Sequence, residues 1–178
     1  MLEIRPVTVN DIEVLAHLHT ESWRDAYRGI LSDQYLDGDI LRERQALWRS
    51  RLQGPAPGQY GLLAFSGTTP AGFAFAFPGA HKRWGTLLDN LHVRPGQRGG
   101  GVGTQLLHAV TGHVKTVHPG EGLFLWVYEL NTRTRAYYER LGAKQIERAE
   151  IAAPGGGTVA EWLYAWSDIE VLHRATRG

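Results

Sequence analysis

The segment Val93–Leu107, VRPGQRGGGVGTQLL, places four glycines within five positions between two apolar segments. Each of these glycines opposes folding, because glycine loses more backbone freedom than any other residue. The preceding residues, Thr86–Val93, have the composition of a strand, and Val102–Val117 repeats apolar residues at the helical period. The glycines therefore indicate a strand-to-helix turn whose backbone must be approached closely by another group.

A turn of this kind can bind an anion. The first N–H groups of a helix have no intrahelical acceptor, and the helix dipole adds partial positive charge to them. Phosphate is the usual ligand of such a site. Arg98 and Thr104 can add a charge-assisted and a neutral hydrogen bond. One or two glycines would more simply indicate unusual backbone angles, whereas four in five positions favour phosphate binding.

The two common nucleotide motifs do not fit. A P-loop ends in Gly-Lys-Ser/Thr, and Gly103-Thr104-Gln105 has no lysine. The dinucleotide fingerprint requires glycines at its first, third and sixth positions, and counting from Gly99 the sixth is Thr104. A nucleotide-binding domain, which would bind ATP or NAD and not coenzyme A, is therefore the least favoured reading of the turn.

The segment resembles the signature of the GNAT superfamily of acyl-CoA-dependent N-acyltransferases. The core pattern Gln/Arg-x-x-Gly-x-Gly/Ala is met by Arg98–Gly103, and the flanking residues agree over LDNLHVRPGQRGGGVGTQLL. A second segment, NTRTRAYYERLGAKQI, is similar to the family's Asn-x-x-x-x-x-Phe/Tyr-Tyr-x-x-x-Gly-Phe segment. The residues in register are Asn131, Tyr137, Tyr138 and Gly142, with Ala143 in place of the usual Phe. The N-terminal third is similar to members whose acceptor preference is uncharacterised.

The resemblance implies a binding mode for acetyl-CoA. Its pyrophosphate would bind the backbone amides of the turn, and its pantetheine arm would lie along the preceding strand end as an additional strand. Asn131 would cap its helix and contact the arm. The residues expected to bind the cofactor are Leu91, His92, Val93, Arg98, Gly99, Gly100, Gly101, Val102, Gly103, Thr104 and Asn131.

The family's strand carries a bulge at this point. Leu88, Leu91 and Val93 are spaced by three and then two residues, which strict alternation cannot bury on one face. One extra residue would restore the face.

The implied reaction is direct attack of a neutral amine on the thioester within a ternary complex. It requires a base for the amine, donors for the oxyanion and an acid for the thiolate. Tyr138 is the candidate acid, with Tyr137 packing its helix, and a backbone N–H near Val93 is the candidate oxyanion donor. The base is left open: Asp89 could relay a proton through water, or it could be an ordinary exposed strand residue. His19 and His92 are less favoured.

The composition limits other functions. The 178 residues are expected to form a single domain, 1–178, and the net charge of +1 gives no support to nucleic-acid binding. There are no cysteines, and the histidine spacing does not suggest a metal site. No apolar run approaches the roughly 20 residues of a membrane span, and no leader pattern is apparent, so a cytoplasmic location is expected.

The pattern predicts an α/β fold: strand, two helices, three strands, helix, strand, helix, two strands. The resemblance implies a single mixed, mostly antiparallel central sheet of about seven strands, splayed between the fourth and fifth and flanked by about four helices. The last dozen residues are expected to be a frayed helix. The expected segments are 2–7, 12–29, 38–52, 59–65, 72–77, 86–93, 102–117, 122–128, 131–142, 144–151 and 158–166.

The amine acceptor stays open. A small polyamine, an aminoglycoside, an amino acid or a protein N-terminus would all fit. Trp23, Tyr27, Tyr35 and Trp48 could line its pocket, although tryptophans at helical spacing more often belong to the core. The alternative to an enzyme is a member that binds coenzyme A without turnover, as a sensor or scaffold. The exposed C-terminal hairpin is compatible with a homodimer.

Overall fold

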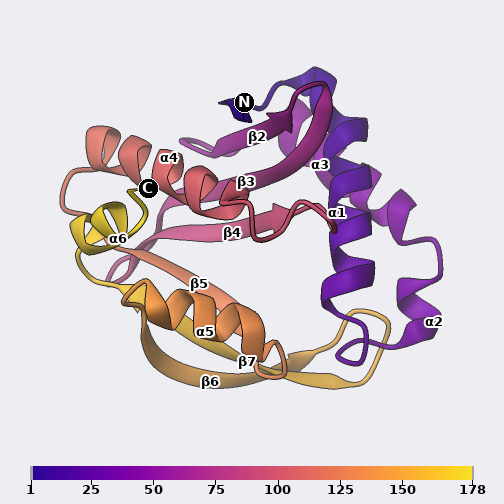
Figure 1. Cartoon of the computed structure of the whole chain (residues 1–178). Helices are drawn as coiled ribbons and strands as arrows, with labels where there is room; N and C mark the ends of the chain where they lie inside the picture. The colour runs from indigo at the N-terminus through magenta and orange to yellow at the C-terminus, as the bar shows by residue number, and fades with distance from the viewer. Residues whose placement is uncertain (1, 178) are drawn as a thin grey trace.

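The protein is built around one sheet with helices on both faces, as the computed structural model of residues 2–177 shows (Figure 1). In chain order the elements are β1 (Leu2–Pro6), a 3-10 turn (Val9–Asp11), α1 (Ile12–Ala26), α2 (Asp33–Leu36), α3 (Ile40–Gln53), β2 (Tyr60–Ser66), β3 (Thr69–His81), β4 (Gly85–Val93), α4 (Val102–Val117), β5 (Leu123–Tyr128), α5 (Thr132–Arg140), β6 (Lys144–Ala152), β7 (Thr158–Trp166) and α6 (Ile169–Ala175).

The sheet has seven strands in the order β1-β2-β3-β4-β5-β7-β6. Every neighbouring pair is antiparallel except β4 and β5. Those two strands pair only at Thr86–Leu123 and Leu87–Phe124, and then diverge. The predicted mixed sheet, splayed between its fourth and fifth strands, is confirmed.

The predicted bulge lies in β4. Against β3, Phe75 pairs with Asn90 and Ala76 with Leu88, so Asp89 has no opposite residue. The extra residue puts Leu88 and Leu91 in the same hydrophobic cluster, as the apolar spacing required. It also turns Asp89 out of the regular ladder, at the point where β4 leaves β5.

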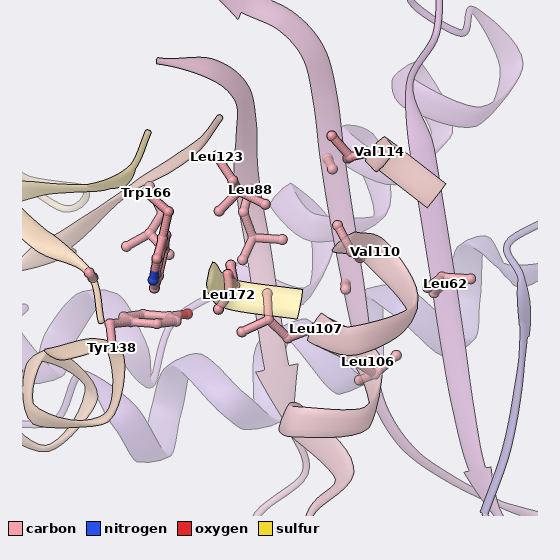
Figure 2. Packing of buried hydrophobic residues seen from close by; sticks show 14 of the residues in the cluster. Leu62, Leu88, Leu106, Leu107, Val110, Val114, Leu123, Tyr138, Trp166 and Leu172 are labelled. Carbon is pink, nitrogen blue, oxygen red and sulfur yellow. The ribbon is translucent and has the colours of Figure 1, made fainter. Parts of the chain in front are cut away.

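Separate hydrophobic clusters cover the two faces. On one face α4 packs on the sheet through Leu106, Leu107 and Val110, all of which are fully buried (Figure 2). On the other face α1 and α3 cover the first half of the sheet, where Trp48 is fully buried against Phe73. Burying an aromatic or aliphatic side chain of this size contributes about 1.5–3 kcal/mol.

Two differences from the sequence prediction have simple causes. The strand expected to end at Phe77 continues, since pairing resumes between His81 and Gly85. The described residues contain six α-helices and not about four, because α2 is a single turn, too short for an apolar period. The expected C-terminal helix is confirmed as α6. No α-helix within residues 2–177 has the length and apolar character that crossing a bilayer demands.

Candidate active site

The glycine turn joins β4 to α4, as predicted. Gly99 and Gly101 have left-handed backbone angles, with φ of 85° and 80°, and Gly100 between them does not. Gly101 is the N-cap of α4. An alternation of left- and right-handed residues turns successive N–H groups toward one centre, which makes a concave anion site.

The amides of this turn are free. Within residues 2–177, the backbone N–H groups of Arg98–Thr104 donate no hydrogen bond to another residue of the protein. Regular pairing resumes at Gln105, whose N–H donates to the carbonyl of Gly101 at 2.9 Å. A run of seven backbone donors without acceptors is costly unless water or a ligand satisfies them. The residues present therefore fit a diphosphate.

The two arginines of the turn form ion pairs with α1. Arg94 donates to Glu21 at 2.9 Å, and Arg98 donates to Asp25. Glu21 and Asp25 are one helical turn apart, so α1 holds the turn at two points. Arg98 therefore already donates to the Asp25 carboxylate. A phosphate bound at the turn would have to share Arg98 with Asp25 or displace Asp25 from it.

The end of β4 offers a free edge to the cofactor arm. Leu91, His92 and Val93 pair with β3 alone, so their other edge, which would have faced β5, has no strand partner. Leu91 and Val93 pack toward α4. This arrangement suits the addition of an extended arm as a further strand.

His92 faces the other way and is buried under α1. Its Nδ1 lies 2.9 Å from the Ser22 hydroxyl, and its ring centroid is 4.9 Å from that of His19. Burial lowers the pKa of His92 to about 3, with the positive charges of Arg98 and Arg44 adding to the effect. Burial likewise places the pKa of His19 well below its usual value. Both rings are neutral at physiological pH and are too weakly basic to take a proton from an amine.

Tyr138 lies near the C-terminal end of α5 and belongs to the hydrophobic cluster that includes Leu106 and Trp166. Its ring packs edge-on against Trp166, with centroids 5.8 Å apart (Figure 2). Only 5% of the residue is exposed, and its hydroxyl forms no hydrogen bond with another residue among 2–177. Burial raises the pKa of the phenol, and Tyr137 and Tyr27 raise it further. Tyr138 therefore stays protonated, as an acid must before it donates.

Tyr137 faces the start of α4. Its hydroxyl lies 3.1 Å from that of Thr104. The contact bridges α4 and α5 across the divergence of β4 and β5. Tyr137 is therefore a link between the two helices as well as a packing residue.

Asp89 is paired with α3. Its carboxylate lies 2.8 Å from a guanidinium nitrogen of Arg51, which also donates to Asn90 at 2.8 Å. The Asp89 side chain is 29% exposed. A proton transfer to Asp89 would have to take place beside this cation.

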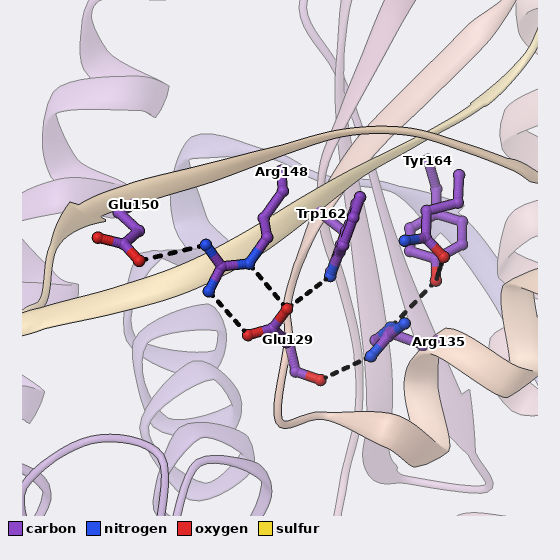
Figure 3. A network of polar contacts seen from close by, with 7 residues as sticks. Glu129, Arg135, Arg148, Glu150, Trp162 and Tyr164 are labelled. Carbon is purple, nitrogen blue, oxygen red and sulfur yellow. Dashed lines mark hydrogen bonds and ion pairs between the residues drawn. The ribbon is translucent and has the colours of Figure 1, made fainter.

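Asn131 caps α5, as predicted: its side-chain oxygen accepts from the N–H of Thr134 at 3.3 Å. Beside it, Glu129 accepts hydrogen bonds from Arg148 and Trp162, while Arg135 donates to Tyr164 (Figure 3). These bonds hold the start of α5 on β6 and β7. They fix the helix that carries Asn131 and Tyr138.

Two charged residues near this region, Arg44 on α3 and Glu161 on β7, were not among the predicted site residues. Glu161 is opposite Tyr128 in the sheet, and burial raises its pKa. It could have been found from the alternation in β7, where its face is otherwise Val159, Leu163 and Ala165, all buried. Trp48, by contrast, belongs to the core.

The described residues contain no group of three or more histidine or acidic side chains placed to hold a metal ion. Two surface hollows, of about 350 and 570 Å³, lie along α4 and α6. The glycine turn does not border either of them.

Known proteins are similar to this chain in sequence and in fold. The model of the acetyltransferase (GNAT) family matches residues 15–143. A probable N-acetyltransferase of Mycobacterium tuberculosis is 28% identical over 140 residues, which are 78% of each chain. The uncharacterized N-acetyltransferase YuaI of Bacillus subtilis is 24% identical over 97% of this chain and 96% of its own.

A solved structure shares the fold. The PaiA N-acetyltransferase of Thermoplasma acidophilum, in complex with coenzyme A, superposes with a TM-score of 0.69. It is 23% identical to this chain and covers 90% of it, with 98% of its own length matched. Family model, relatives and fold agree, and this chain belongs to the GNAT acetyltransferase family.

Proposed function

We propose that this protein transfers an acetyl group from acetyl-CoA to the primary amine of a small molecule or peptide, by direct attack in a ternary complex. The observation that carries the proposal is the run of free amides in Arg98–Thr104, at the N-terminus of α4. A diphosphate would supply the acceptors that these donors lack. The acetyl thioester would then lie where β4 leaves β5.

The chain's own groups can serve each step. The amine nitrogen attacks the thioester carbon, the C–N bond forms and the C–S bond breaks. A backbone N–H of β4 near Val93 would stabilise the oxyanion. Tyr138 would give its phenolic proton to the departing thiolate and recover one from solvent. The amine's proton would leave through Asp89 or through water.

The proton transfer from Tyr138 is energetically reasonable. An ordinary thiol has a pKa of roughly 8.5 and a phenol of about 10, so the transfer is uphill by about 2 kcal/mol in water. Burial raises the pKa of Tyr138. It would also destabilise a thiolate formed in the same surroundings, so burial disfavours the two anions alike.

The test combines binding with turnover. Coenzyme A affinity is measured by calorimetry, and coenzyme A release is followed with a thiol reagent across a panel of primary amines. The chain has no cysteine, so the reagent has no background from the protein. Binding with amine-dependent release supports the proposal. Binding without release across the panel would favour the sensor or scaffold alternative.

A further inference from the structure

Three aromatic rings form a row between α1 and β5. The centroids of Trp23 and Tyr27 are 5.1 Å apart, and those of Tyr27 and Tyr128 are 4.9 Å apart. The row adjoins the candidate catalytic residues, because the Asp89 carboxylate is near enough to raise the pKa of Tyr27, and Tyr27 is near enough to raise that of Tyr138. It is therefore placed to hold the acceptor.

Arg44 lies at the Trp23 end of this row. Its guanidinium carbon is 4.3 Å from the centre of the Trp23 ring, and only 13% of its side chain is exposed. One of its terminal nitrogens contacts the adjacent Glu43 at 3.3 Å and the Tyr35 hydroxyl at 3.5 Å. The Glu43 carboxylate is 52% exposed and also accepts from Tyr35 at 2.7 Å. The Nε of Arg44 is buried and has no partner.

Among residues 2–177, the other arginines around the site have no nitrogen that is buried without a hydrogen-bond partner. Arg51 has Asp89 and Asn90, Arg94 has Glu21 through two nitrogens, and Arg98 has Asp25. A guanidinium has five N–H donors, and burying one with donors unused is costly. Arg44 is the most buried of these four side chains, and among residues 2–177 its Nε is the one arginine nitrogen that is buried without a partner. Its guanidinium lies over the Trp23 ring, at one end of the aromatic row.

Further buried polar groups without partners lie beyond the Trp23 ring that Arg44 covers. They are the indole N–H groups of Trp23 and Trp48 and the two ring nitrogens of His19, which in its neutral form has one donor and one acceptor. The rings of Trp23 and Trp48 each pack against His19, at 5.3 and 5.8 Å, so these groups are neighbours. A set made mainly of donors and including a cation matches a carboxylate, which only accepts hydrogen bonds.

The opposite charge lies at the other end of the row. Glu161 is opposite Tyr128 on the adjacent strand, and it forms no ion pair with another residue among 2–177. Both Glu161 and Arg44 are close enough to Tyr128 to influence its pKa, in opposite directions. A cation, three aromatic rings and an anion therefore follow one another across this region.

We infer that the acceptor is a small amine that also carries a carboxylate, of the amino acid type, and that Arg44 binds the carboxylate. The amino group of the acceptor would then lie at the other end of the aromatic row, near Glu161 and Tyr128, where it would meet the acetyl thioester. Arg44 is a specificity-determining residue in this arrangement. The inference rests on the proposed acetyl transfer and adds the substrate class to it.

The test compares each of the twenty L-amino acids with its own amide, as acceptors in the coenzyme A release assay. We expect kcat/KM for the preferred amino acid to exceed that for its amide by at least tenfold. Arg44→Gln should abolish this preference, mainly through KM, and leave the Kd of coenzyme A unchanged. Arg42→Gln is the control, because Arg42 is on the exposed side of the same helix; it should behave as the wild type.

Equal turnover of amino acids and amides by the wild type would overturn the inference, and so would a preference that survives Arg44→Gln. If Arg44→Gln does not fold, Arg44→Lys replaces it, because lysine keeps the charge but loses the bidentate fork and should still weaken the preference. If no panel member is acetylated, binding of the amino acids to the coenzyme A complex is measured by calorimetry. Saturable binding that Arg44→Gln removes supports the inference, and no binding overturns it. A protein that does not bind coenzyme A would instead refute the proposed function.

Discussion

Acid should destabilise this protein, because His92 is buried in its neutral form. The pKa of His92 is lowered to about 3, against an ordinary value of 6.5. Between these two values the unfolded chain binds a proton that the folded chain refuses, so the free energy of unfolding falls as pH falls below 6.5. Burial is the main cause, and the positive charges of Arg98 and Arg44 also oppose protonation of the ring, while neighbouring His19 is neutral.

The magnitude follows from the two pKa values. Each unit of difference is worth about 1.4 kcal/mol, so His92 alone should lower the free energy of unfolding by about 2 kcal/mol between pH 7 and pH 5. His19, whose pKa is lowered mainly by burial, should add to this loss. A loss of this size is a large part of the ~5–15 kcal/mol that stabilises a typical domain.

The assay is urea unfolding, followed by tryptophan fluorescence and circular dichroism at pH 7, 6 and 5. His92→Asn removes one titrating group, so its free energy of unfolding should fall by about 2 kcal/mol less than that of the wild type over this range. The control is His17→Asn, the same substitution at an exposed position of α1, the helix that carries His19. An equal fall in wild type and His92→Asn would refute the reasoning.

Four further predictions concern the cofactor and the chemistry. Gly100→Asp should weaken coenzyme A binding by about 1–3 kcal/mol through charge repulsion. The control, Gly100→Ala, should fold normally, because the φ of Gly100 is not left-handed and an added Cβ meets nothing closer than 3.7 Å. Equal affinities of the two variants in calorimetry would place the diphosphate elsewhere. Tyr138→Phe should lower turnover by about a hundredfold or more with little change in coenzyme A affinity, and normal turnover would remove Tyr138 as the acid. Asp89→Asn should shift the acidic limb of the pH–rate profile, and an unmoved limb would exclude Asp89 as the base. Asp25→Asn should free Arg98 for the phosphate and tighten coenzyme A binding by up to about fivefold, within the ~1 kcal/mol expected of an exposed pair; weaker binding would mean that the pair holds the turn in its binding shape.

Much of the fold could be predicted from the sequence, because periodicity and special residues act locally. The glycines marked the β4–α4 turn, and the bounds of α4 and β7 were predicted exactly as Val102–Val117 and Thr158–Trp166. The bulge in β4 was predicted from the family resemblance together with the apolar spacing of Leu88, Leu91 and Val93, and the structure places it at Asp89. Each of these features depends on neighbours within a few residues along the chain.

The region proposed to bind the acceptor could not be predicted in the same way. Arg44, Tyr128 and Glu161 come from α3, β5 and β7, and only the folded sheet brings them near one another. The buried state of His92 was equally hidden, because its strand position does not reveal that Ser22 and His19 close over it. Such sites depend on contacts between distant segments, which a pattern along one segment does not contain.

The binding of a diphosphate by bare amides is tested most directly by amide hydrogen exchange, measured by NMR with and without coenzyme A. The prediction is that Arg98–Thr104, whose N–H groups have no partner in the protein, exchange more slowly and shift downfield when coenzyme A is added. Saturable binding of coenzyme A that leaves these amides unprotected would contradict it.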